Sequence, residues 1–160
     1  MIYRLDYLYS DFAKTALEGA QRHFTGCPDD MTVVLKGHLM VEKLMRDFCV
    51  SQLPNPEYFV KAKLGFSQLA LITRSIAVCP SVEDDGGWLW GAVNRLNSVR
   101  NLYAHNLDPD AGKLEGELEK LRCSLNSIQS VEEPDWAGRM SWFVGMFSTY
   151  MYLSAQENSE

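Results

Sequence analysis

VVLKGHLMVEKLMRDF, residues 33–48, is the stretch that decides the fold. Its apolar side chains recur every three or four residues, which places them on one face of an α-helix. This apolar stripe consists of Val33, Gly37, Met40, Val41, Leu44, Met45 and Phe48. Asp29 and Asp30 precede it, and an aspartate can cap the free backbone N–H groups of a first turn. The stretch therefore predicts a long amphipathic helix.

The same period continues along the chain, interrupted by glycine, proline and acidic segments that end helices. The expected helices cover residues 5–24, 33–48, 59–78, 89–103, 114–125 and 136–153. No segment alternates apolar and polar residues as a strand does. We therefore expect an all-α, compact bundle of six helices that forms a single domain over residues 1–160.

The last of these helices is apolar on two sides. Trp136, Met140 and Phe143 begin one stripe, and Trp142 and Met146 begin another. A membrane span is disfavoured because a charged Arg and several small polar residues interrupt the segment. A helix buried in the bundle or facing a second subunit is the better interpretation.

Composition indicates an ordinary globular protein, with 46% hydrophobic and 22% charged residues. The first residues lack the pattern of a secretory signal, so we expect a cytoplasmic protein. The cysteines at 27, 49, 79 and 123 are far apart and form no C-x-x-C pair, so core thiols are expected. We expect no metal and no other cofactor.

The formal net charge is -6, which argues against strong non-specific binding to nucleic acid. Such binding depends mainly on cationic side chains that displace counterions. RNA binding would have to be weak, or concentrated where two subunits bring their arginines together.

Residues 96–107, LNSVRNLYAHNL, place polar side chains on a helix that otherwise packs an apolar face. Asn101 and His105 are four residues apart and share one side of the helix. Arg100 lies nearly opposite His105, but its side chain is long enough to curl back. We therefore expect Arg100, Asn101 and His105 to reach one cleft.

An arginine, a polar residue and then a histidine near a helix end resembles the motif of the HEPN (higher eukaryotes and prokaryotes nucleotide-binding) superfamily. Residues 37–44, GHLMVEKL, look like the second helix of that group. Residues 58–64 and 69–72 are similar to the third helix of its mannitol-repressor-like branch. The resemblance covers roughly residues 30–107.

The resemblance implies a homodimer in which two such motifs face each other across a groove that cuts RNA without metal, as in bacterial toxins and antiviral phage-defence proteins. His105 would act as general acid or base, and Arg100 would bind the scissile phosphate and stabilise its growing charge. Asn101 would orient the phosphate or the histidine.

Leu107 departs from the pattern of one subgroup. Members paired with nucleotidyltransferases carry a tyrosine two residues after the histidine, so the leucine argues against that toxin–antitoxin subgroup. The mannitol-repressor-like branch implies an alternative function, a non-catalytic module of transcriptional regulation that binds a protein partner. A protein partner or antitoxin therefore stays possible beside RNA.

The polar residues also have purely structural interpretations. His105 can end the helix by binding free carbonyl groups, and Arg100 can pair with Glu42. His38, Glu42 and Arg46 are spaced four apart, which is typical of a solvated edge of ion pairs. A functional alternative is that Glu42 orients Arg100 from across the bundle.

Overall fold

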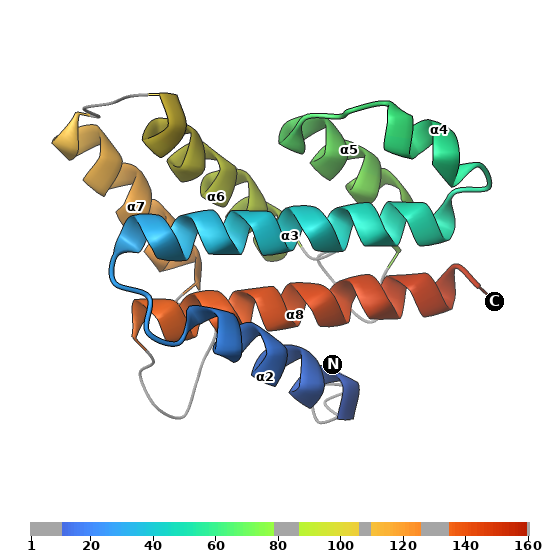
Figure 1. Cartoon of the computed structure of the whole chain (residues 1–160), viewed down its shortest axis with the longest axis horizontal. Coiled ribbons are helices and arrows are strands. Elements are labelled where there is room, and N and C mark those ends of the chain that lie inside the picture. The colour runs from blue at the N-terminus through green and yellow to red at the C-terminus, as the bar shows by residue number, and fades with distance from the viewer. Residues whose placement is uncertain (1–10, 79–86, 106–109, 126–134, 160) are drawn as a thin grey trace.

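The computed structural model describes residues 11–78, 87–105, 110–125 and 135–159, and these residues form helices and no strand (Figure 1). The helices are α2 (Asp11–Phe24), α3 (Asp30–Gln52), α4 (Pro56–Lys61), α5 (Phe66–Ile76), α6 (Gly87–His105), α7 (Ala111–Leu125) and α8 (Trp136–Glu157). The all-α prediction is confirmed. The predicted helix over residues 5–24 lies partly outside the described residues.

Local chemistry sets several of the helix ends. The Asp29 carboxylate accepts a hydrogen bond from the Thr32 backbone N–H at 2.7 Å and so caps α3, as expected. Asp135 caps α8 in the same way through Gly138 N–H at 2.7 Å. Gly26 follows α2 with a φ of 72°, a conformation that glycine adopts without steric cost.

The predicted helix over residues 59–78 is wrong in one respect, because the chain breaks between α4 and α5. Lys63 has a φ of 47°, which no continuous right-handed helix allows. Gly65 then starts α5, and its N–H donates to Gln68 Oε1 at 3.1 Å. A residue of α3 stabilises the turn between the two helices, since Arg46 Nη2 donates to the Leu64 carbonyl oxygen at 2.9 Å.

The two long helices α3 and α8 lie side by side at the centre of the molecule (Figure 1). α2 packs on α8, while α5 and α6 pack on α3, and α7 packs mainly on α6. Helix α8 therefore has neighbours on more than one side. This arrangement explains its two apolar stripes within one protomer: most of its side chains from Met140 to Met151 are buried.

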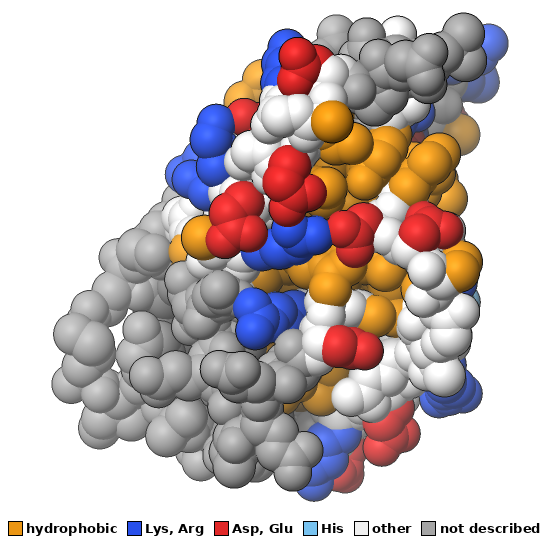
Figure 2. Space-filling view, turned by 90° about the vertical axis from the view of Figure 1, so that its left-hand side faces the viewer, with side chains coloured by type: hydrophobic (Ala, Val, Ile, Leu, Met, Phe, Trp, Pro, Cys, Tyr) orange, Lys and Arg blue, Asp and Glu red, His pale blue; other side chains and the backbone are white. Residues whose placement is uncertain are grey.

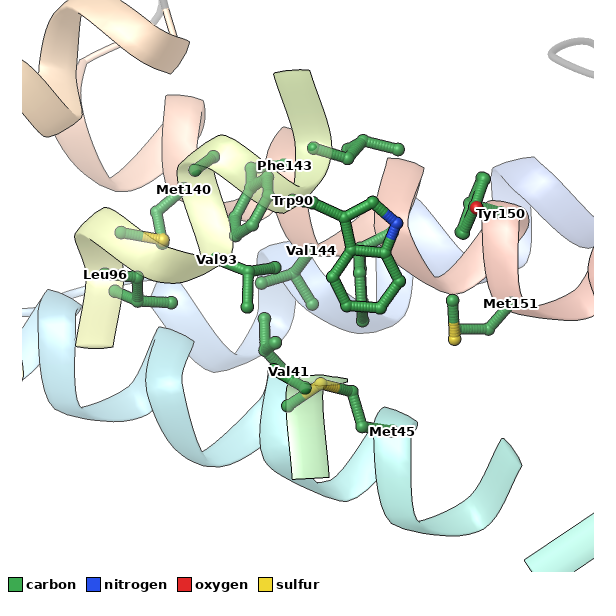
Figure 3. Packing of buried hydrophobic residues seen from close by; sticks show 14 of the residues in the cluster. Val41, Met45, Trp90, Val93, Leu96, Met140, Phe143, Val144, Tyr150 and Met151 are labelled. Carbon is green, nitrogen blue, oxygen red and sulfur yellow. The ribbon is translucent and has the colours of Figure 1, made fainter. Parts of the chain in front are cut away.

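The core forms where α3, α6 and α8 meet (Figure 3). Trp90 of α6 is 2% exposed and meets the rings of Phe147 and Tyr150 edge-on, with centroids 5.5 and 6.1 Å away. Val41 and Met45 of α3 approach from below in the same view. Burying one such side chain stabilises the fold by about 1.5–3 kcal/mol.

The cysteine prediction holds for one described residue and is wrong for another. Cys49 is buried, and burial raises the pKa of its thiol. Cys123 is exposed on α7, and Cys27 is partly buried. Cys79 lies outside the described residues. Among the helices that the structure describes, none combines the length and apolar character needed to cross a membrane.

Candidate functional site

The C-terminal turns of α6 carry the three residues predicted to form the site. Arg100 and Asn101 are partly buried, and His105 is exposed as the last residue of the helix. Arg100 Nη1 donates a hydrogen bond to Asn101 Oδ1 at 3.2 Å. The guanidinium therefore leans toward Asn101.

This hydrogen bond decides on which side of α6 the positive charge lies. Residues four apart in an α-helix differ by about 40° around the axis, and residues five apart by about 140°. Asn101 and His105 therefore share a face that the backbone of Arg100 does not. Because Asn101 holds the guanidinium, the charge of Arg100 is drawn toward the face that carries His105.

A polar network that includes the buried His38 lies one turn before the motif. Asn97 of α6 faces His38 of α3, with 3.2 Å between Asn97 Oδ1 and His38 Nε2. The Asn97 side-chain N–H donates to Ser67 Oγ of α5 at 3.2 Å. The His38 ring stacks on Phe66, with centroids 4.0 Å apart. Asn97 thus links α6 to both α3 and α5.

The tautomer of His38 follows from the orientation of the Asn97 amide. Asn97 uses its N–H to reach Ser67, so its oxygen must accept from His38, and Nε2 carries the proton. Burial is the main cause that lowers the pKa of His38 below 6.5. The bond to Asn97 opposes that shift, the charge of Arg100 adds to it, and Glu42 opposes it. A neutral imidazole at neutral pH follows.

The expectation of a solvated ion-pair edge on α3 is wrong for His38, which is 4% exposed. It holds for the next two residues, since Glu42 Oε1 accepts from Arg46 Nε and Nη2 at 3.1 and 2.8 Å. Among the described residues, no ion pair within 4.0 Å joins Glu42 to Arg100. Glu42 therefore holds Arg46 against the α4–α5 turn and does not bind Arg100 directly.

The charge of Arg100 is not neutralised by a carboxylate within 4.0 Å in the part of the chain that the structure describes. Arg122 of α7 is the contrast: it pairs with Asp30 and Glu115 at 2.6 and 2.7 Å and lies over the ring of Trp136. Acidic and basic side chains indeed mix at the end of the molecule where α3 and α8 begin (Figure 2). Arg100 is thus better placed than Arg122 to receive an anion.

The sequence did not single out Asn97, Ser67 or Phe66. Asn97 carried a signal, because it precedes Asn101 by four residues and continues the same helix face inward. Ser67 and Phe66 follow a chain break that the apolar period concealed. Their contact with residues of α3 and α6 depends on tertiary packing.

Other features lie away from the motif. Within the described ranges, no three His, Cys, Asp or Glu side chains gather as a metal site requires. A surface pocket of about 510 Å³ lies between the end of α2 and the start of α8 and includes Phe24, Cys27 and Ser141. No motif residue lines it.

No family model, curated protein or solved structure matches this chain. A function is therefore inferred from the side chains and their geometry alone.

Proposed function

We propose that this protein is a metal-independent endoribonuclease of the HEPN type, acting through Arg100, Asn101 and His105. The observation that carries the proposal is the hydrogen bond from Arg100 Nη1 to Asn101 Oδ1, which draws the guanidinium toward the face of His105. Among the described residues, this guanidinium forms no ion pair with a carboxylate within 4.0 Å. A guanidinium and an imidazole are suited to phosphodiester cleavage: one binds the phosphate and the other moves protons near neutral pH.

The reaction uses these side chains from two subunits and the 2′-hydroxyl of the RNA itself. His105 takes the proton of a ribose 2′-hydroxyl, and the 2′ oxygen attacks the adjacent phosphorus. Arg100 stabilises the charge that builds on the phosphoryl oxygens. The 5′ oxygen leaves with a proton donated by His105 of the partner subunit. The products are a 2′,3′-cyclic phosphate and a free 5′-hydroxyl.

The role proposed for Asn101 differs from the expected orientation of the phosphate or the histidine. Its Oδ1 accepts from Arg100, so it orients the guanidinium and only indirectly the phosphate. Loss of Asn101 is therefore expected to reduce cleavage less than loss of Arg100.

The second acid–base group requires a homodimer in which two α6 ends face each other. The dimer would also bring two Arg100 side chains together. A protein with a net charge of -6 could then bind phosphate, because the two guanidinium groups would form a local cationic groove. Light scattering at high protein concentration tests this dimer, and a strictly monomeric mass contradicts it.

The nuclease test is incubation of purified protein with mixed single-stranded RNA in excess EDTA. Loss of a general acid–base or of one charge-stabilising donor costs about 10²–10⁴-fold, so Arg100→Ala and His105→Ala should each nearly abolish cleavage. Arg22→Ala and His23→Ala are matched controls, because this exposed Arg–His pair also ends a helix. Activity that falls equally in the controls, or survives in both motif variants, contradicts the proposal.

A second candidate function is a non-catalytic regulatory module that binds a protein. Large exposed apolar side chains favour it: Tyr58 is 69% and Leu71 is 71% exposed. This candidate predicts no cleavage under any condition, together with a stoichiometric protein partner whose capture is lost in Tyr58→Ser or Leu71→Ser. Recovery of RNA in place of that partner counts against it.

A further inference from the structure

We propose that His38 is a positioning residue for Arg100: it holds Asn97 against α3 and thereby fixes the turn of α6 from which the guanidinium projects. The inference rests on the proposed function. It assigns a role to a histidine that is far from the motif in sequence and, at 4% exposed, is too buried to act on a substrate directly.

The first support is the way His38 is fixed. It is 4% exposed, stacks on Phe66 at 4.0 Å, and donates through Nε2 to Asn97 Oδ1 at 3.2 Å. A ring held on its face and at its edge has little freedom to turn. His38 is therefore a firm attachment point for the amide of Asn97.

The second support is the place of Asn97 in α6. It precedes Arg100 by three residues and Asn101 by four, so it lies one helical turn below both of them. Its other bond, to Ser67 Oγ at 3.2 Å, ties the same amide to the start of α5. A rotation of the last turns of α6 must therefore break bonds to two other helices. This restraint fixes the direction in which Arg100 leaves the helix.

The third support is charge. Among the described residues, two charged groups act on His38: Arg100 on α6 and Glu42 on α3, the latter with 4.0 Å between Oε2 and Nδ1. From α5, the uncharged ring of Phe66 stacks on His38. A neutral His38 leaves Arg100 without a second positive charge behind it, and a protonated His38 adds one. The state of His38 and the environment of Arg100 are thus coupled.

The kinetic test compares His38→Leu with His38→Gln in the full chain. Leucine keeps the bulk but leaves Asn97 Oδ1 without its donor, whereas the glutamine amide can donate in place of Nε2. A small displacement of a reacting group costs about 100-fold in rate. We expect kcat to fall about 100-fold in His38→Leu with KM little changed, and to recover largely in His38→Gln. The control is His23→Leu, an exposed histidine on α2.

Equal losses in the leucine and glutamine variants overturn the proposal, and so does a folded His38→Leu protein with wild-type kcat. Circular dichroism establishes the folded state of each variant.

A second measurement keeps the inference separate from nuclease activity. Side-chain NMR of the wild-type protein follows the Arg100 Nε–H signal while the pH falls below 6.5. We expect this signal to move with the midpoint of the His38 ring, and the movement to persist in His105→Asn and disappear in His38→Gln. If the protein does not cut RNA but still shows this coupling, only the proposed function is refuted. If the Arg100 signal does not change as His38 is protonated, the positioning role is overturned, whether or not RNA is cut.

Discussion

Substitution of Gly145 by alanine tests how closely α2 packs on α8. A Cβ at Gly145 would lie 3.2 Å from Leu17 Cα and 3.4 Å from its Cβ. The first of these atoms belongs to the backbone of α2, so the contact is relieved only by moving the helix. Leu17 itself is partly buried against α8.

Two effects of opposite sign compete in this variant. Replacing a glycine inside a helix by alanine stabilises the fold by about 1 kcal/mol, whereas overpacking a filled interface costs about 1–3 kcal/mol. We expect a net loss of up to about 2 kcal/mol for Gly145→Ala. For a chain of this size, that corresponds to a fall in Tm of up to about 8 °C.

Gly116→Ala on α7 is the matched control. A Cβ there meets nothing within 4 Å, so only the favourable helix effect applies. We expect this variant to gain up to about 1 kcal/mol and its Tm to rise by about 2–4 °C. Thermal unfolding followed by circular dichroism measures both. If Gly145→Ala is stabilised as much as Gly116→Ala, the packing of α2 on α8 described above is refuted.

Three further outcomes are expected. Asp29→Ala should lower the free energy of unfolding by about 0.5–2 kcal/mol, because the carboxylate bonded to Thr32 N–H is lost, and Asp29→Asn should restore most of it in urea titrations. Burial lowers the pKa of His38 in the folded state, so the unfolded chain binds the proton first; wild-type stability relative to His38→Gln should therefore decline as the pH falls below 6.5 and be constant above it. Alkylation of the native protein, mapped by mass spectrometry, should modify Cys123 and spare Cys49, and equal labelling of both would contradict the burial of Cys49.

Much of the fold follows from local patterns in the sequence. The stripe that begins at Val33 and the cap at Asp29 both belong to short segments, and helical period and capping act within one or two turns. The break at Lys63 could not be predicted in this way. The apolar period runs through it from Phe59 to Phe66, and the turn is held by Arg46 from a different helix.

The candidate site likewise has a part that local sequence predicts and a part that depends on tertiary packing. Arg100, Asn101 and His105 are near in sequence, and the helical period alone predicts that Asn101 and His105 share a face. The lean of Arg100 toward that face is not fixed by the period and comes from its hydrogen bond to Asn101. The contact between His38 and Asn97 joins residues 59 positions apart and depends on how α6 packs on α3. The spacing of His38, Glu42 and Arg46 indicated only a shared stripe, and burial of its first member is a consequence of tertiary structure.

The most direct measurement of the central claim uses one RNA oligonucleotide of defined sequence that the wild-type protein cuts in EDTA at a mapped position. The same oligonucleotide is then made with a single 2′-deoxy ribose at that position. The proposed reaction requires the 2′ oxygen as its nucleophile. Cleavage of the unmodified RNA should therefore leave 2′,3′-cyclic phosphate and 5′-hydroxyl ends, and cleavage of the modified RNA at the deoxy position should vanish. Unchanged cleavage of the deoxy-substituted strand would contradict the roles assigned to Arg100 and His105.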